Sequence, residues 1–264
     1  MASDCTTEYT LYSSPFSLYS MMARHTIQLG PTTQDAKSPP KIDLVFINHR
    51  KNEALKQDYL LKVNPKGQVP SMTGASLKKS LNDSRSISLF LAENHYPAML
   101  PPQHGAIIRG LLERLHAVPG PSFSNKNPTV EMKQHNPSPA EEILKRDGAR
   151  GQSSIPAIVA QAHADLHAIF AEIVEHRKES EAFGNPAAWT FGDQVGPTVL
   201  DSHLLPFVLR CMEAGYESLI PEELRHWAVH KSQSPTWFKV MRGRPTQWHP
   251  SMGPVEDMQD MMVL

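Results

Sequence analysis

The chain has 264 residues, enough for one large domain or two small ones, and its 40% hydrophobic and 20% charged residues are typical of a soluble globular protein. Its 26 basic and 27 acidic side chains leave a formal net charge of −1, which disfavours nucleic-acid-binding proteins because they usually carry a basic excess. Two cysteines, Cys5 and Cys211, are too few for a disulfide framework and favour a reducing compartment. No apolar run approaches the roughly 18 residues of a membrane span, and no signal-peptide pattern opens the chain. We therefore expect a cytoplasmic protein without membrane insertion.

Residues 1–97 alternate between strand patterns and helix patterns. Runs rich in β-branched and aromatic residues predict strands, and apolar residues at helical spacing predict helices. In chain order the expected elements are a strand at 10–12, a helix at 18–29, a strand at 42–47, a helix at 52–63, strands at 69–73 and 76–81, and a helix at 84–94. A crossover helix between the first two strands implies a parallel pair, and the close spacing of the last two implies an antiparallel hairpin. This βαβαββα order is that of a thioredoxin-like domain.

Residues 98–104 follow as a linker, and no convincing strand appears after them. The sequence predicts an all-helical domain over 105–264, so the fold class is α/β plus all-α. Its expected helices lie at 106–118, 155–177, 198–214, 222–231 and 236–242. Residues 119–154 are polar and rich in proline, and they are too long for a tight turn. They predict a flexible insertion, which is either an ordered flap or disordered.

The turn Ser14-Pro15-Phe16-Ser17 lies between the first strand and the first helix. In a thioredoxin-like domain this position carries the reactive group, because the helix N-terminus offers free N–H groups and a partial positive charge. Serine stands at both ends of what would be a C-x-x-C motif, and disulfide exchange needs sulfur, so a redox role is excluded here. A serine hydroxyl can donate a hydrogen bond to a thiolate brought by a ligand. The alternative is that Ser14 or Ser17 only caps the helix.

Two further segments could bind a ligand. If the Val69–Pro70 bond is cis, Val69 presents its N–H and C=O to a bound peptide as a neighbouring strand would; the alternative is an ordinary turn. Asp83 and Ser84 stand immediately before a helix. They are either a helix cap or a site for a ligand that carries both a carboxylate and an ammonium group.

Taken together, the order and spacing of these segments resemble those of the glutathione S-transferase family. The resemblance rests on Leu11-Tyr12-Ser13, on Asn64-Pro65-Lys66-Gly67-Gln68-Val69-Pro70 and on Asp83-Ser84-Arg85-Ser86-Ile87. It extends into the helical half, where Gly192-Asp193 precede Pro197-Thr198-Val199-Leu200-Asp201. This run is similar to the family's capping box, in which Thr198 caps the helix and Asp201 reaches back to the cap N–H.

The resemblance implies a glutathione site in the first domain and a hydrophobic acceptor site against the second. By position, Ser17 is similar to the catalytic serine of the theta-like and zeta-like classes, and Ser14 stands where the omega class has its cysteine. These two are the candidate catalytic residues.

The resemblance also implies the groups that hold glutathione. The Val69–Pro70 bond would be cis, and Val69 would pair through its backbone with the cysteinyl part. Asp83 and Ser84 would hold the γ-glutamyl end. Gln68 would approach the glycyl end. The family's usual Glu-Ser step is Asp-Ser here, one methylene shorter.

The implied function is activation of the glutathione thiolate for addition to an electrophilic double bond of a small hydrophobic molecule. The product is a conjugate or, after rotation and elimination, a cis–trans isomer. The long proline-rich insertion is similar to those of fungal transferases that act on specialised metabolites, which favours a polyketide-like substrate. Family members usually form homodimers. The alternative is a non-catalytic binding or assembly module of the same fold.

Thirteen histidines raise the question of a metal site. His163 and His167, and likewise His226 and His230, are spaced i, i+4, but no H-E-x-x-H motif or completing ligand pattern is present. No metal is expected. His25 or water could move a proton during elimination, and the methionines at 258, 261 and 262 are interpreted as a helix edge or a frayed tail.

Overall fold

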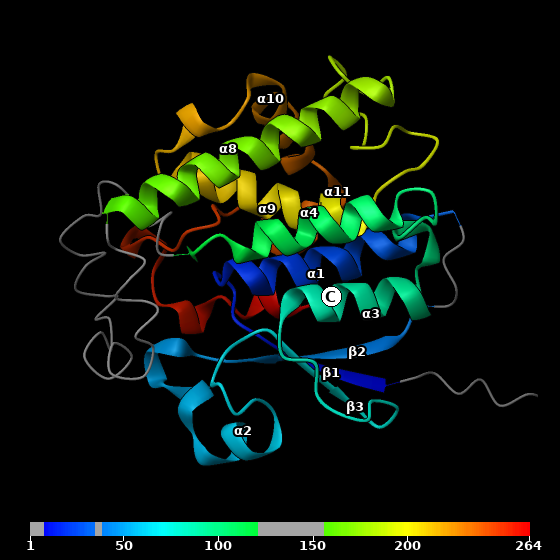
Figure 1. The fold of residues 1–264 in the computed structure, drawn as a ribbon. Helices are drawn as coiled ribbons and strands as arrows, with labels where there is room; N and C mark the ends of the chain where they lie inside the picture. The colour runs from blue at the N-terminus through cyan, green and yellow to red at the C-terminus, as the bar shows by residue number, and fades with distance from the viewer. Residues whose placement is uncertain (1–7, 35–38, 121–155) are drawn as a thin grey trace, which may run out of the picture.

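The computed structural model describes residues 8–34, 39–120 and 156–264 (Figure 1). The small sheet consists of β1 (Glu8–Ser13), β2 (Lys41–Phe46) and β3 (Ser71–Gly74), in the order β2-β1-β3. As predicted, β1 runs parallel to β2 and is joined to it through a helix. β3 is antiparallel to β1. The expected fourth strand is reduced to one antiparallel bridge, between Met72 and Leu81.

Helices cover both faces of this sheet. In Figure 1, α1 (Leu18–Leu29) and α3 (Ser84–Asn94) lie on one side, and α2 (Gln57–Lys62) lies on the other. The bounds of α1 and α3 match the predicted ranges. The helix predicted at 52–63 is shorter than expected, because extended backbone at Lys56 separates a 3-10 turn at Glu53–Leu55 from α2.

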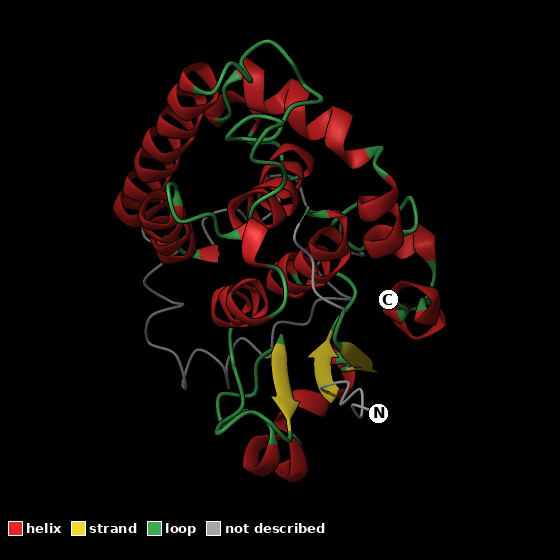
Figure 2. Cartoon of the chain, turned by 90° about the vertical axis from the view of Figure 1, so that its right-hand side faces the viewer, coloured by secondary structure: helices red, strands yellow, loops and turns green. Residues whose placement is uncertain are grey.

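In the second half the described residues form helices joined by loops, with no strand among them (Figure 2). Its α-helices are α4 (Gly105–Ala117), α8 (Pro156–Glu179), α9 (Val199–Glu213), α10 (Glu222–Ser232) and α11 (Pro235–Met241). This confirms the predicted fold class. By length and mean hydropathy alone, 157–179 of α8 could cross a membrane. Leu166, Phe170 and Ile173 of that helix are fully buried in the protein core, although only 33% of its apolar stretch is buried.

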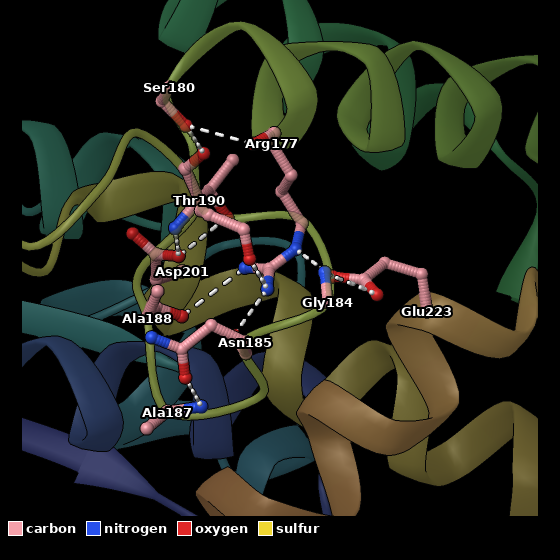
Figure 3. Close-up of polar contacts among 10 residues, drawn as sticks. Arg177, Ser180, Gly184, Asn185, Ala187, Ala188, Thr190, Asp201 and Glu223 are labelled. Atoms are coloured by element: carbon pink, nitrogen blue, oxygen red, sulfur yellow. Dashed lines mark hydrogen bonds and ion pairs between the residues drawn. The ribbon is translucent and has the colours of Figure 1, made fainter.

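The loop before α9 is held by a network of buried polar groups, which Figure 3 shows. The Thr198 side chain accepts from the Asp201 N–H, and the Asp201 carboxylate accepts from the Thr198 N–H at 2.8 Å, so the predicted capping box is confirmed. Arg177, fully buried at the end of α8, donates to three carbonyls of the loop and pairs with Glu223 at 2.9 Å. The loop is therefore fixed from both ends.

The C-terminal segment packs on the rest of the molecule. Its 3-10 helix Gln259–Met262 contacts both α11 and β2. Met258, Met261 and Met262 are buried, so their interpretation as an edge or a frayed tail was wrong. Their side chains complete a core that local sequence spacing does not reveal. The predicted insertion at 119–154 lies, apart from Pro119 and Gly120, outside the described residues.

Candidate functional site

The topology brings the three predicted segments to one end of the sheet. The turn Ser14–Ser17 follows β1, and Pro70 directly precedes β3, whose Ser71 pairs with Tyr12 at the end of β1. Because Leu81 bridges to Met72, the chain leaves the same end of the sheet to begin α3. In Figure 1 the N-terminal ends of α1 and α3 lie at this end. A ligand placed there would meet both helix N-termini.

Ser17 is the N-cap residue of α1. Its backbone is extended, and its Oγ accepts a hydrogen bond from the Ser20 N–H at 3.3 Å. The capping alternative is therefore confirmed for Ser17. An oxygen that accepts from a backbone N–H can still donate its own hydrogen, and the half-buried Ser17 hydroxyl can donate to an anion.

Ser14 lies deeper than Ser17. It is 6% exposed, and its N–H donates to Ser20 Oγ at 3.3 Å, while its carbonyl accepts from the Ser17 N–H. The preceding Ser13 has a buried Oγ with no partner among the described residues. The turn thus holds three serine side chains within a short distance along the chain, and Ser17 is the most exposed of them.

The fully buried Arg24 and the half-buried Arg210 support this turn, and no sequence pattern predicted either of them. Arg24 of α1 donates to the Pro15 carbonyl at 2.7 Å, and Arg210 of α9 donates to the Phe16 carbonyl at 2.8 Å. Burial lowers the pKa of both guanidinium groups. No carboxylate pairs with Arg24 among the described residues, so its charge is available to stabilise an anion near the turn.

The other hydrogen bonds of these arginines reach the C-terminal part of the chain. Arg24 donates to the carbonyls of Val240 and Met261 at 2.9 and 2.7 Å, and Arg210 donates to the Thr246 carbonyl at 2.5 Å. The sequence predicts the helical spacing of the apolar residues in α1. An arginine within that helix carries no local signal of such distant partners.

The Val69–Pro70 peptide bond is cis, as predicted. The Gln68 carbonyl just before it accepts from the Tyr59 hydroxyl at 2.7 Å and from Asn64 Nδ2 at 3.0 Å. The N–H and C=O of Val69 form no hydrogen bond with another described residue. The segment is therefore held in place by its neighbours while Val69 keeps both backbone groups available. The Gln68 side chain is exposed.

Asp83 is the N-cap residue of α3. Its carboxylate is exposed and accepts from the Ser86 N–H at 2.8 Å and from Ser86 Oγ at 2.6 Å. Ser84 is buried, and its Oγ lies 3.8 Å from Met22 Sδ. The N–H groups of Ser84 and Arg85 form no hydrogen bond within the described part of the chain. Ser84 thus offers a ligand its backbone rather than its hydroxyl.

Two other expectations concern histidine. Among the described residues, no three His, Cys, Asp or Glu side chains come together as metal ligands. His25 is 1% exposed, its Nδ1 lies 3.2 Å from the Ser202 carbonyl, and burial lowers its pKa to about 4. A group so enclosed is unsuited to move a proton to or from a substrate at the turn.

Two cavities lie elsewhere. One, of about 320 Å³, lies between the end of β1 and α2, where Tyr12, Lys56 and Tyr59 contribute to its lining. The other, of about 240 Å³, lies between α9 and α11, beside Glu213, Trp237 and Thr246. Neither is lined by any of the six predicted site residues.

No protein-family model and no curated protein matches the chain. Solved structures do. A glutathione transferase F2 from Populus trichocarpa is 20% identical, with a TM-score of 0.59 over 90% of this chain and 100% of that one. Ure2p in complex with glutathione is 15% identical, with a TM-score of 0.61 over 90% and 94%. A bacterial zeta-class maleyl pyruvate isomerase is 18% identical, with a TM-score of 0.53 over 87% and 95%. The chain therefore has the fold of the glutathione transferases.

Proposed function

We propose that the protein is a glutathione-dependent enzyme whose site lies at the end of the sheet where α1 and α3 begin. One observation carries the proposal. The Ser17 hydroxyl, the two unpaired backbone groups of Val69 and the capped N-terminus of α3 all adjoin that end. Structures solved with bound glutathione, Ure2p among them, share the fold.

The residues present fit glutathione. The N–H and C=O of Val69 match the backbone of a cysteinyl residue as a further strand would. The free N–H groups of Ser84 and Arg85, with the helix dipole, suit a carboxylate, and the exposed Asp83 carboxylate suits an ammonium group. Asn82 Oδ1 is buried without a partner among the described residues, so an acceptor remains unused beside Asp83.

Glutathione supplies a sulfur nucleophile to such a site. An ordinary thiol has a pKa of about 8.5 and is mostly protonated at neutral pH. The Ser17 hydroxyl, the α1 N-terminus and the charges of Arg24 and Arg210 all favour the thiolate. The chain's own described thiol does not compete, because burial raises the pKa of Cys211 to about 12. Ser14 is the alternative donor.

The proposed reaction is addition of the thiolate to an electrophilic double bond of a small hydrophobic molecule, such as a polyketide-like intermediate. Conjugation keeps sulfur on the product, whereas isomerisation returns glutathione after the former double bond has rotated. The zeta-class isomerase among the fold neighbours supports keeping both outcomes. The theta-like or zeta-like assignment rests on the position of Ser17.

The experiment has two stages. Calorimetry with glutathione tests the site, and an absence of binding would overturn the proposal. Mass spectrometry of the product under substoichiometric glutathione then tests the reaction. Many turnovers without a change of substrate mass indicate isomerisation, and a product heavier by one glutathione indicates conjugation. Binding without turnover of any conjugated electrophile would favour the non-catalytic module.

The proposal includes the setting of the enzyme. Residues 1–97 form the glutathione-binding domain, 98–104 the linker, and 105–264 the acceptor domain. A cytoplasmic homodimer follows from the family resemblance and from the low cysteine content. Light scattering at the mass of one chain would contradict the dimer.

A further inference from the structure

A chain of hydrogen bonds crosses the interface of α1, α3, α4 and α9, and the proposed function does not use it. His116 Nε2 lies 2.8 Å from His203 Nδ1, and His203 Nε2 lies 2.9 Å from Ser88 Oγ. Ser88 Oγ accepts from Thr26 Oγ1 at 2.8 Å, and Thr26 Oγ1 lies 2.7 Å from Ser202 Oγ. His116 is half buried, whereas the other four residues are buried. The chain therefore has one end near the surface, at His116.

The donors of this chain can all point toward His116. Thr26 Oγ1 has one hydrogen and also lies 3.1 Å from the Met22 carbonyl. When Ser202 donates to Thr26 and Thr26 donates to Ser88, the Ser88 hydrogen is free to be donated to His203 Nε2. Burial holds the pKa of His203 well below its usual range, so the ring is neutral and carries one proton. When Nε2 accepts from Ser88, that proton is on Nδ1 and is donated to His116 Nε2. Burial likewise lowers the pKa of His116 to about 4. On this assignment neutral His116 carries its proton on Nδ1, which forms no hydrogen bond with a described residue.

His116 stands beside the helix N-termini of the proposed site. Its ring lies 5.5 Å from that of Tyr19 in the first turn of α1, two residues after Ser17. The charges of Asp83 and Arg85 at the start of α3 act on its pKa in opposite directions. In Figure 1 the C-terminal end of α4 lies at the same end of the molecule as the N-terminal ends of α1 and α3. His116 thus borders the site from the helical half.

We propose that His116 is a catalytic residue whose Nδ1–H donates a hydrogen bond to the carbonyl oxygen of a conjugated carbonyl substrate. This inference rests on the proposed function and names its substrate class, the α,β-unsaturated carbonyl compounds. His203 and Ser88 are positioning residues, because they act through His116 by holding its proton on Nδ1.

The hydrogen bond matters because charge develops on that oxygen. As the thiolate sulfur bonds to the β-carbon, the electron pair of the double bond moves toward the carbonyl and a pair moves onto its oxygen. In isomerisation the pair returns and the carbon–sulfur bond breaks, so no net proton transfer is needed. In conjugation water supplies the proton to the α-carbon. A donor already aimed at the oxygen stabilises the charged state more than the neutral one.

A matched pair of variants separates this role from a structural one. The amide of glutamine reaches the position of Nε2, so His116→Gln keeps a partner for His203 but removes the donor at Nδ1. The amide of asparagine reaches the position of Nδ1, so His116→Asn keeps that donor and loses the bond to His203. Benzylideneacetone, a conjugated ketone, and nitrobenzyl chloride, which reacts without charging a carbonyl, are the electrophiles.

We expect His116→Gln to lower kcat with benzylideneacetone by about 10- to 100-fold, since a hydrogen bond to a charged group contributes roughly 1.5–3 kcal/mol. KM for glutathione and turnover of nitrobenzyl chloride should stay unchanged, and His116→Asn should retain most of the activity with the ketone. Equal losses with both electrophiles, or an unchanged rate for His116→Gln with the ketone, would overturn the assignment.

A readout without turnover tests the same proton. Nitrogen-15 NMR of the protein alone should show neutral His116 with its proton on Nδ1, and Ser88→Ala should shift part of it to Nε2. A proton on Nε2 in the unsubstituted protein would contradict the inference. Calorimetry with glutathione keeps the two proposals apart, because binding of glutathione together with a silent His116→Gln refutes only the role of His116.

Discussion

The loop before α9 and the turn after β1 are both fixed by buried arginines, but the two networks draw on different parts of the chain. Arg177 binds carbonyls that follow it by 5, 8 and 11 residues. Arg24 joins the Pro15 carbonyl to the carbonyls of Val240 and Met261, which are 216 and 237 residues away from it. The first network stabilises a local loop. The second makes the proposed catalytic turn depend on the C-terminal segment.

The largest effect is expected at the local network. Arg177→Met leaves three carbonyls and the Glu223 carboxylate without their buried donor. Removing one partner of a buried ion pair costs about 3–5 kcal/mol of unfolding free energy. Urea denaturation measures this loss, and the exposed neighbour Lys178→Met should change stability by less than about 0.5 kcal/mol. Glutathione affinity of the folded variant should stay unchanged. A fall in affinity would show that the two networks are coupled.

Acid should weaken the interface of α1, α3, α4 and α9, where three histidines are held neutral. The folded-state pKa values of His25 and His116 are lowered to about 4, and burial holds that of His203 well below its usual range. An unfolded histidine titrates near 6.5, so the unfolded chain binds more protons below that pH. Stability is fully present above pH ~6.5 and falls by roughly 1.4 kcal/mol per pH unit for each histidine down to its folded pKa.

Urea midpoints between pH 7 and pH 5 measure this acid effect. His226→Gln, at an exposed position of α10, serves as the control and should leave the pH dependence of stability unchanged. A flat profile for the unsubstituted protein would contradict the neutral histidines.

Variants of Ser17 separate its helix-capping role from its proposed role in stabilising the thiolate. Ser17→Ala should reduce turnover about 10- to 100-fold with glutathione affinity roughly intact, because it removes a hydrogen bond to an anion worth roughly 1.5–3 kcal/mol. It also removes the cap at a cost of about 1 kcal/mol, whereas glycine at an N-cap costs only a few tenths. Ser17→Gly should therefore lose turnover with little loss of stability. A damaging Ser14→Ala beside a silent Ser17→Ala would move the catalytic hydroxyl to Ser14.

Arg210 tests the long-range network. Arg210→Met removes a half-buried charge and the side-chain donor to the carbonyls of Phe16 and Thr246. We expect the pKa of bound glutathione to rise by about one unit, which is ~1.4 kcal/mol of lost thiolate stabilisation. Ultraviolet absorbance of the thiolate against pH measures it, and Arg210→Lys should restore part of the shift because it returns the charge. If neither variant moves this pKa, the arginine supports the fold alone.

Asp83 should give the smallest effect. Asp83→Asn keeps an equivalent cap for α3 but removes the charge proposed to meet an ammonium group. Glutathione affinity should fall about 5- to 10-fold, since a partly exposed charge pair contributes on the order of 1 kcal/mol. Calorimetry measures the change, and Asp83→Ala should weaken binding at least as much. Unchanged affinity in both variants would remove Asp83 from the site.

Local patterns in the sequence predicted much of this molecule. The bounds of α1 and α3 and the capping box of Asp201 depend on residues close together in the chain, and the parallel crossover follows from the order of the local elements. The cis bond at Val69–Pro70 was expected from the family resemblance. Helical spacing, caps and proline chemistry act over a few residues, so they can be recognised without the fold.

Tertiary structure decided what surrounds the proposed site. The predicted helix at 52–63 broke at Lys56, and the methionines of the C-terminal segment became core because β2 and α11 cover them. Burial turned Ser84 toward Met22 and enclosed His25. The partners of Arg24, Arg210 and His116 are distant in sequence, and side-chain hydrogen bonds of that kind have no periodic signature. Only the folded chain brings these groups together, because contacts across the interface arise from packing and not from local propensity.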